Sequence, residues 1–560
     1  MKKFSFLCMV FLLLSLMIFS KVRDSAGQVP VIPPDILPVV FLQGSDHEMG
    51  LQYGKQAGEY ILKVVESYWA EALERFSRKE VMKALKANQY YIRKYAPECI
   101  TIMRGIAQGM NEDGHPVQYA DILLINGTLP PPESSHYPSE AAAETLFSKK
   151  CSVCSAWGPA TREGKLIGLD TLDSGEAHYG VLIVAFPREG HAYMTGAQAG
   201  AIGSHFLMNH RGLFIGNSGG GGSVRERDQD YGISWFCGLP HMIRFCSNAR
   251  EARKMITDWQ IDIPENFHLA DTRGNAWVVE KTAALQAVRK SGDFGERDFL
   301  FSTNNYLCGK MKVTKKGGFI GEHGGYGAYS APRNHLFWDM LHNYHGNIDE
   351  DFMKMILRFP GNPPPVPPSG GWSAKICRPS NSWVAVAVPD DGDRGYAWLC
   401  TGPAGRVIHS SMAFDGTTMR TNYLYPGGTH TFYQMHLAKN PDSSTRLAKG
   451  SAADAIATAY EKLMDLKYTD PGYAALERIH DRAVSEYFQG NAWYHRWASR
   501  PGNRPLQWLS KAATLYTRAQ AHARQVFEAL VSPPTAPSDL GLKPFGGDWA
   551  EWETQTGKKE

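Results

Sequence analysis

Cys151 combines a reactive side chain with a position at which the chain is readily cut. The preceding residues 129–150 read LPPPESSHYPSEAAAETLFSKK, a composition that predicts an exposed linker. Cleavage between Lys150 and Cys151 would give Cys151 a free α-amino group, whose pKa of about 8 lies within reach of neutral pH. Such an amine can act as the general base for the thiol of the same residue. One residue would then supply both nucleophile and base, with no need for a separate catalytic histidine.

Other reactive side chains offer weaker alternatives. Cys151 and Cys154 form half of a zinc or redox motif, but no second pair at zinc spacing and no βαβ pattern accompany it. Because side chains alternate along a strand, Cys154 is expected on the opposite face from Cys151. Two histidine pairs could be metal ligands, His342 with His345 and His430 with His436. Neither pair has a cysteine or an acid at ligand spacing. We therefore expect neither a metal nor any other cofactor.

The elements that would position Cys151 change in character along the chain. Apolar residues recur every four positions between about 46 and 115, which predicts helices. After Lys150 the pattern predicts strands, beginning with Cys151–Trp157 and Lys165–Leu172 joined by a turn. Further helices are expected at 248–259, 334–358, 451–466, 470–488 and 505–531. Strands in runs and helices in runs favour an α+β fold in stacked layers over alternating βαβ units.

The overall composition limits the class of protein. The 560 residues are 43% hydrophobic and 21% charged, which is typical of globular proteins and excludes a disordered, collagen-like or coiled-coil chain. The net charge of +3 and the absence of a dense Lys/Arg block argue against a nucleic-acid partner. The sequence does not indicate an oligomeric state.

The first 27 residues have the features of a secretory signal peptide. Lys2 and Lys3 precede an apolar run from Phe4 to Phe19, and small residues follow it. The run is shorter than the roughly 18–20 residues that span a bilayer, which favours a cleaved signal over a membrane anchor. We expect a secreted or periplasmic protein without stable membrane insertion. Sequence alone does not pair the cysteines that remain after Cys8 into disulfides.

Residues 151–170, CSVCSAWGPATREGKLIGLD, resemble the start of the catalytic chain of N-terminal-nucleophile (Ntn) hydrolases. The family that they resemble most is the isopenicillin-N/6-aminopenicillanate acyltransferase type, whose members process themselves, and the choloylglycine (bile-salt) hydrolases are related. Further short segments resemble motifs of the family and follow one another in the same order along the chain. They are residues 103–109 with 121–126, 208–213, 270–280, 302–304 and 330–333. The resemblance implies a four-layer αββα fold. It also implies a signal peptide at 1–27, a helical prosegment at 28–150 and a catalytic chain at 151–560, helical after about 440.

The resemblance implies roles for individual residues as well. Cys151 would be the nucleophile, with its own amine as base, and Asn304 and Asn217 would donate hydrogen bonds to the oxyanion. Asp170 would hold and orient the α-ammonium group. The family more often has Asn at this position and Asp two residues later, so Asp173 is an alternative.

The implied activity is hydrolysis or transfer of an acyl group at a linear amide, through a thioester on Cys151. The partners would be a small acyl-amine or acyl-amino acid substrate and the chain's own prosegment, and Arg333 would steady the site electrostatically or bind a substrate carboxylate. The same chemistry would cut before Cys151, unless a trypsin-like protease cuts after Lys150. Two alternatives are a phospholipase-B-like lipid amidase or esterase, and an inactive binding protein on an Ntn scaffold.

Overall fold

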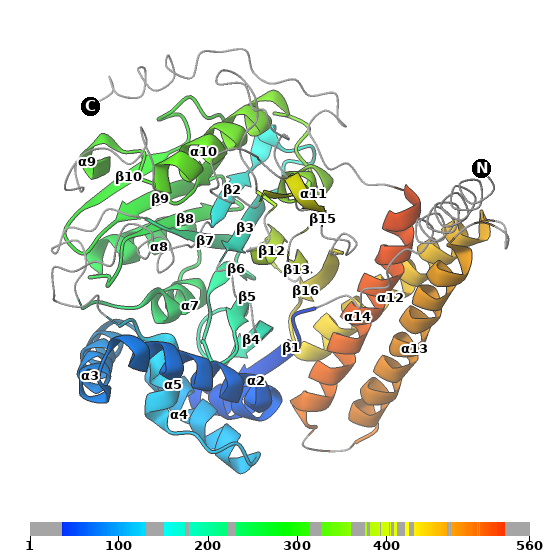
Figure 1. Ribbon diagram of the computed structural model, residues 1–560, viewed down its shortest axis with the longest axis horizontal. Helices are drawn as coiled ribbons and strands as arrows, with labels where there is room; N and C mark the ends of the chain where they lie inside the picture. The colour runs from blue at the N-terminus through cyan, green and yellow to red at the C-terminus, as the bar shows by residue number, and fades with distance from the viewer. Residues whose placement is uncertain are drawn as a thin grey trace, which may run out of the picture.

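The protein is described here by a computed structural model, which combines two large β-sheets with helices in an α+β arrangement (Figure 1). The structure describes residues 36–129, 151–173, 179–220, 231–312 and 326–359. From 376 to 531 it describes all residues except 378–380, 393, 403, 405–407, 411–420, 425–430, 467–469, 471, 501 and 503. The predicted linker at 129–150, apart from its first residue, the signal peptide and His430 lie outside the described residues.

The N-terminal part consists of one strand followed by four helices. These are β1 Val39–Gly44, α2 Asp46–Arg75, α3 Arg78–Tyr95, α4 Pro97–Glu112 and α5 Tyr119–Asn126. Capping boxes start α2 and α3, because Ser45 and Ser77 each exchange hydrogen bonds with the glutamate three residues later. Glycines bring α2 and α4 into close contact: a Cβ atom on Gly50 would lie 2.1 Å from the carbonyl oxygen of Ile102. The helices between 46 and 115 are confirmed, whereas β1 was not expected.

Eight strands form the first sheet, in the order β1-β4-β5-β6-β7-β8-β9-β10. Its strands after β1 are β4 Gly180–Pro187, β5 Tyr193–Gln198, β6 His205–Asn209, β7 Leu213–Gly219, β8 Glu265–Asp271, β9 Ala276–Lys281 and β10 Gln286–Lys290. β1 pairs parallel with β4, and the other neighbours are antiparallel. The N-terminal part therefore supplies an edge strand to this sheet.

Six strands form the second sheet, in the order β11-β2-β3-β12-β13-β16. They are β2 Ser152–Ala156, β3 Ile167–Asp173, β11 Phe299–Ser302, β12 Asn381–Val388, β13 Gly395–Thr401 and β16 Tyr433–Leu437; β14 Ile408–Ser410 and β15 Thr421–Leu424 pair separately. The expected hairpin after Cys151 is present as β2 and β3, with Val153 opposite Asp170.

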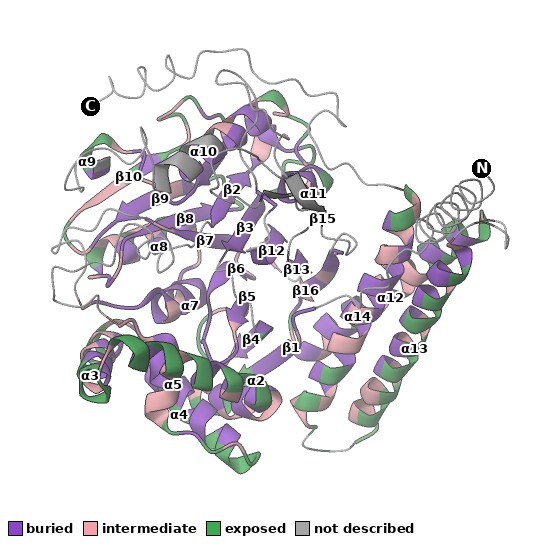
Figure 2. Cartoon of the chain, in the orientation of Figure 1, coloured by how far each residue is buried: buried purple, intermediate pink, exposed green. Residues whose placement is uncertain are grey.

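The remaining helices cover the sheets and extend beyond them. They are α7 Trp235–Phe245, α8 Ala249–Asp258, α9 Gly309–Lys312, α10 Tyr326–Asn343, α11 Glu350–Arg358, α12 Pro441–Met464, α13 Tyr473–Ala498 and α14 Leu506–Val531. One core lies between the eight-stranded sheet and α2–α5, α7 and α8. A second core lies between the sheets, and a third lies between the six-stranded sheet and α10 and α11 (Figure 2).

The helix expected at 334–358 is two helices. The chain turns between α10 and α11, where Gly346 has a φ of +87° that favours glycine. The Gly346 amide donates to the carbonyl oxygen of Ala160 over 2.8 Å, which fixes the turn against the loop between β2 and β3. Helical periodicity continues across this point, so the break was not apparent in the sequence.

The N-terminal part is joined to the C-terminal helices through β1. The amide of Val39 donates to Thr514 Oγ1 over 3.0 Å, and the amide of Phe41 donates to Ser510 Oγ over 3.1 Å. None of the described helices is both long and apolar enough to cross a bilayer. The eight cysteines in the described segments form no disulfide bond with one another.

Candidate active site

Cys151 lies immediately before β2, and it is completely buried in the core between the two sheets. Val153 belongs to the same core, as expected for two residues on one face of a strand. Cys154 lies on the opposite face, where its Sγ is 3.9 Å from Sδ of Met353 in α11. The predicted separation of the two cysteines is therefore observed, and they do not form a CxxC pair with converging sulfurs.

Asp170 and His205 form a buried pair beside Cys151. His205 Nδ1 lies 3.2 Å from Asp170 Oδ1, and both side chains are at most 2% exposed. The side chain of Cys151 lies near enough to the His205 ring to affect its pKa. Burial lowers the pKa of His205, but the charges and hydrogen bonds of Asp170 and Cys151 outweigh burial and raise the pKa to about 10. His205 is therefore an imidazolium at neutral pH, between a carboxylate and the sulfur.

The backbone next to His205 is strained. Phe206 has a φ of +36°, which is unusual for a residue other than glycine and costs roughly 1–3 kcal/mol. Its amide donates to Asp170 Oδ2 over 2.8 Å, while the His205 side chain engages Oδ1 of the same carboxylate. Two consecutive residues of β6 thus bind one carboxylate of β3 across the space between the sheets. This geometry fixes the orientation of the imidazolium.

The alternative acid, Asp173, occupies a different place. It is buried at the end of β3 and pairs in register with Asn381 of β12. Asp170 and Asp173 are three residues apart on one strand, so their side chains point to opposite faces. The structure therefore brings Asp170, and not Asp173, to the face of β3 that Cys151 shares.

Arg333 of α10 reaches the backbone of Cys151. Its Nη1 donates to the Cys151 carbonyl oxygen and to Ser152 Oγ, each over 2.7 Å. Its Nη2 donates to Asn304 Oδ1 over 2.9 Å and to Ser330 Oγ over 3.1 Å. The guanidinium is completely buried, so it holds parts of the site together and is not a surface ion pair. This position agrees better with electrostatic support than with binding of a substrate carboxylate.

Asn304 follows β11, which pairs antiparallel with β2 so that Ser302 lies opposite Val153. This register brings Asn304 level with Cys151 at the ends of the two strands. Asn304 Nδ2 donates to the carbonyl oxygen of Gly219 over 3.0 Å, and its Oδ1 accepts from Arg333. An amide nitrogen carries two N–H groups, so one N–H of Asn304 is left after the bond to Gly219.

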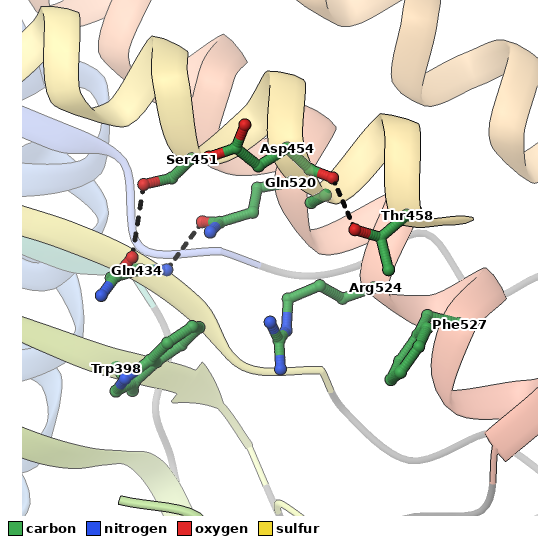
Figure 3. Close-up of a pocket in the computed structure, with 9 residues that line it drawn as sticks. Trp398, Gln434, Ser451, Asp454, Thr458, Gln520, Arg524 and Phe527 are labelled. Carbon is green, nitrogen blue, oxygen red and sulfur yellow. Dashed lines mark hydrogen bonds between the residues drawn. The ribbon is translucent and has the colours of Figure 1, made fainter. Parts of the chain in front are cut away.

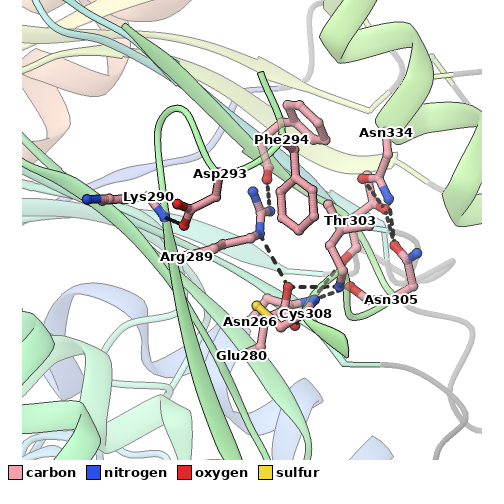
Figure 4. Close-up of polar contacts among 12 residues, drawn as sticks. Asn266, Glu280, Arg289, Lys290, Asp293, Phe294, Thr303, Asn305, Cys308 and Asn334 are labelled. Carbon is pink, nitrogen blue, oxygen red and sulfur yellow. Dashed lines mark hydrogen bonds and ion pairs between the residues drawn. The ribbon is translucent and has the colours of Figure 1, made fainter. Parts of the chain in front are cut away.

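The loop that carries Asn304 is anchored by buried polar residues (Figure 4). The carbonyl oxygen of Thr303 accepts from Asn266 Nδ2 over 2.7 Å and from Ser218 Oγ over 2.9 Å. The hydroxyl of Thr303 contacts Asn305 Oδ1 and Asn334 Oδ1 over 3.0 and 2.9 Å. Both sheets and α10 therefore fix the position of Asn304.

Glu280 of β9 fixes the next part of the same loop. Its carboxylate accepts hydrogen bonds from the amides of Leu307 and Cys308 over 2.9 and 3.0 Å. Arg289 of β10 lies 3.3 Å from this carboxylate, and it also donates to the carbonyl oxygen of Phe301 in β11 (Figure 4). Arg289 and Glu280 are both at most 2% exposed at the side chain. A buried charge pair therefore connects the edge of the eight-stranded sheet to the strand that leads to Asn304.

The structure does not place Asn217 as expected. Gly216 faces the six-stranded sheet, because a Cβ atom there would lie 2.5 Å from Val153 Cγ1 and 3.1 Å from Asp170 Oδ2. The next residue in β7, Asn217, therefore points to the other face, which the helices cover. It is buried, and its Oδ1 has no hydrogen-bond partner within the described segments. Strand alternation thus separates the side chain of Asn217 from Cys151. The expectation that this side chain is the second oxyanion donor is therefore withdrawn.

A cavity of about 240 Å³ lies apart from Cys151, between α12, α14 and the end of the six-stranded sheet (Figure 3). Its walls include Trp398, Gln434, Gln520, Arg524 and Phe527. No residue that contacts Cys151 lines it. Within the described ranges, no cluster of three or more His, Cys, Asp or Glu side chains has the arrangement of a metal site.

Sequence reasoning missed His205 altogether. The segment 205–209 forms β6, but nothing in its sequence pattern indicates what the histidine faces. The contact with Asp170 crosses from one sheet to the other and joins residues 35 positions apart. The only local signal is that a histidine precedes apolar residues at a buried strand position.

Three comparisons place the chain among known proteins. No family model matches it. An uncharacterized protein of Archaeoglobus fulgidus is 29% identical over 309 residues, and the match covers 49% of this chain and 51% of that protein. This chain therefore matches only about half the length of that relative.

Solved structures with weak similarity include three amide-cleaving enzymes. An N-acylethanolamine-hydrolyzing acid amidase ortholog of Caenorhabditis elegans is 13% identical, with a TM-score of 0.30, over 43% of this chain and 93% of that one. A mutant conjugated bile acid hydrolase of Clostridium perfringens is 14% identical, with a TM-score of 0.31, over 52% and 98%. Penicillin V acylase of Agrobacterium tumefaciens is 11% identical, with a TM-score of 0.29, over 52% and 93%. Scores this low do not establish a shared activity.

Proposed function

We propose that this chain is an Ntn-type cysteine amidohydrolase or acyltransferase, which opens a linear amide of a small acyl compound through a thioester on Cys151. One observation carries the proposal: Cys151 is buried between the sheets near the His205–Asp170 pair, while Arg333 binds the carbonyl of Cys151 and the side chain of Asn304. In this proposal the two sheets with helices on both outer sides form the four-layer αββα fold. Residues 1–27 direct the protein out of the cytoplasm.

His205 provides the proton transfer that the intact chain needs. Before cleavage the nitrogen of Cys151 is part of a peptide bond, so it cannot act as a base. The His205 imidazolium stabilises a thiolate on Cys151 in the way that a positive neighbour activates other catalytic cysteines. Asp170 keeps the ring charged and oriented, since one carboxylate oxygen binds the ring and the other binds the Phe206 amide.

Self-cleavage then follows as an acyl shift. The sulfur attacks the carbonyl carbon of residue 150, a C–S bond forms, and the C–N bond to Cys151 breaks. The His205 imidazolium gives its proton to the departing nitrogen, which becomes the free amine. Water hydrolyses the thioester, which releases the carboxylate of residue 150 and the Cys151 thiolate. Of the two protons that water supplies, one returns to His205 and the other goes to the new α-amine. The same sequence of steps acts on a substrate amide afterwards, with the α-amine as a second base.

Asn304 and Arg333 stabilise the oxyanion of each tetrahedral intermediate. The N–H group of Asn304 that does not bind Gly219 can be directed at the developing charge, and the Arg333 guanidinium lies beside it. Removing one such donor typically lowers kcat by about 10²–10³-fold. Both side chains are held by several bonds, so little reorganisation is needed during the reaction.

The prosegment remains bound after cleavage in this proposal. β1 is an edge strand of the eight-stranded sheet, and α2 and α4 belong to the core on the outer face of the same sheet. Release would expose that core to water, at about 25 cal/mol per Å² of apolar surface. The cut protein is therefore a complex of two chains.

Intact mass and N-terminal sequencing of the purified protein, beside Cys151→Ala, test the proposal. We expect the wild type to contain a chain that starts at Cys151, and the variant to remain uncut. If neither protein is cut, the amine never forms and the Ntn mechanism fails. If both are cut, an external protease makes the cut, and release of an amine from acyl-amines and acyl-amino acids by the wild type alone must then establish catalysis.

A further inference from the structure

The connected ends of α13 and α14 carry a cluster of tryptophan and basic side chains far along the chain from Cys151. The cluster, called here the basic tryptophan patch, consists of Trp493, Arg496, Trp497, Arg500, Arg504, Trp508 and Lys511. The four cationic residues are exposed, and the three tryptophans are half-buried. Figure 1 shows these ends of α13 and α14 at the edge of the molecule.

The cations of the patch are stacked on its indole rings. The Arg496 guanidinium lies 5.3 Å from the ring centre of Trp493 and 4.6 Å from that of Trp508. Arg500 lies 5.0 Å from Trp508. Arg504 and Lys511 lie 4.9 and 4.7 Å from Trp497 and Trp493. These cation–π contacts keep the positive charges close together in a defined arrangement.

Negative charge is absent from this part of the chain. Between Glu486 and Glu528 the sequence has five arginines and one lysine but no Asp or Glu. The acid nearest to the patch in the described contacts is Asp442 of α12, which binds Arg446 and the hydroxyl of Tyr494. The patch is therefore a local positive surface on a chain whose net charge is only +3.

We propose that the basic tryptophan patch binds the surface of an anionic lipid bilayer. Clustered Lys and Arg side chains are attracted to anionic headgroups, and each contributes roughly a fivefold gain in binding near the surface. Indole rings favour the boundary between headgroups and acyl chains. Trp493 and Trp497 also pack against the core, so only the exposed parts of the three indole rings are available to a bilayer, and a soluble polyanion would use the cations alone. The inference goes beyond the proposed amidase activity and does not depend on it.

Co-sedimentation of the full-length protein with vesicles tests the inference. The vesicles are phosphatidylcholine alone, or phosphatidylcholine with phosphatidylglycerol at about 3:1. We expect binding only to the vesicles with phosphatidylglycerol, weakening as salt is raised. The variant Arg496→Gln/Arg500→Gln/Arg504→Gln should bind at least about 30-fold more weakly, because three cations are lost. Tryptophan emission should be quenched by brominated lipid in the wild type, because the indoles enter the boundary region.

Two further variants separate charge from structure. Changing Lys79, Lys83 and Lys86, which are exposed residues of α3, to glutamine removes the same charge elsewhere and should leave binding unchanged. Changing the three arginines to lysine keeps the charge and should retain most of the binding. The inference is overturned if the wild type does not bind phosphatidylglycerol vesicles, or if the α3 variant loses as much binding as the patch variant. Equal binding to soluble polyglutamate without quenching by brominated lipid would also overturn it, in favour of a polyanionic partner.

Discussion

His205 and Asp170 lie 35 residues apart in the sequence and face each other between the two sheets, with 3.2 Å from Nδ1 to Oδ1. We expect His205→Asn to slow cleavage before Cys151 by about 10²-fold or more, because the sulfur loses its positively charged neighbour and the departing nitrogen loses its proton donor. The fraction of uncut chain on a denaturing gel over time measures this rate. Asp170→Asn should slow cleavage as well, because the ring loses its charged partner.

A spectroscopic titration distinguishes this chemical role from a structural one. The thiolate absorbance near 240 nm is obtained from two difference spectra. In the wild-type background, the spectrum of Cys151→Ser is subtracted from that of the wild type. In the cleavage-defective His205→Asn background, the spectrum of the double variant with Cys151→Ser is subtracted from that of His205→Asn. The wild type should show a stronger thiolate absorbance at neutral pH than the His205→Asn background, because the substitution removes the positive charge near the sulfur. Identical titrations in the two backgrounds would contradict the assignment of His205.

Arg333→Lys should impair the site although it keeps the positive charge. Lysine has a single ammonium group and cannot reach the Cys151 carbonyl, Ser152 and Asn304 together. We expect turnover of an acyl-amide substrate to fall by about 10²-fold with a smaller change in KM. Arg162→Lys is the control, because Arg162 forms an exposed ion pair with Asp349 and should tolerate the change.

Glu280→Gln should destabilise the protein by about 1.5–3 kcal/mol, because the buried Arg289 loses the closer of its two carboxylate partners and keeps only Glu296, at 3.5 Å. The free energy of unfolding in urea measures this effect. Glu59→Gln provides the comparison, since its ion pair with Lys63 is exposed and contributes at most about 0.5 kcal/mol. Equal effects of the two substitutions would show that the Glu280–Arg289 pair is not structurally important.

Two buried histidines should give opposite pH dependences of stability. Burial, with the charge of Arg289, lowers the pKa of His268 to about 3, so His268 disfavours the folded state increasingly as pH falls below about 6.5. The pKa of His205 is raised to about 10, so its contribution is complete below about 6.5 and is lost as pH rises towards 10. We expect His268→Gln to reduce the decrease in Tm as the pH is lowered. We expect His205→Asn to reduce the decrease in Tm as the pH rises towards 10.

The two fragments should remain together after cleavage. β1 makes hydrogen bonds to Thr514 and Ser510 in addition to its pairing with β4, so the prosegment should co-elute with the catalytic chain in gel filtration. Ser510→Ala with Thr514→Val removes both side-chain acceptors and should make the prosegment dissociate at a lower urea concentration. Elution of wild-type fragments as separate species in buffer would contradict the expected complex.

The sequence predicted local structure well and long-range contacts poorly. Alternation placed Cys154 opposite Cys151, and the turn after Trp157 predicted the hairpin of β2 and β3, in which Asp170 pairs with Val153. These relationships depend only on strand period and turn length. The partner of Asp170 was missed because His205 belongs to a different sheet, and no local pattern determines how two sheets face each other.

Two other errors have similar causes. Asn217 was chosen from an approximate motif, but the register of β7 turns its side chain away from Cys151, and a shift of one residue reverses the face. β1 was missed because it precedes a strongly helical region and its partner strand β4 lies far along the chain. In both cases the outcome depends on pairing between distant segments.

The bonds from β1 to α14 also set an order on biosynthesis. The hydroxyls that accept from the backbone of residues 39–44 belong to Thr514 and Ser510, which lie 475 and 469 residues further along the chain. Until α14 is made, the Val39 amide lacks this acceptor, at a cost of roughly 1–3 kcal/mol if the amide is buried, whereas the Phe41 amide keeps Gln56 Oε1 at 3.2 Å. The β1 edge of the eight-stranded sheet is therefore completed only after α14 has been made, so products truncated before α14 would lack these contacts and would be exposed to proteolytic removal.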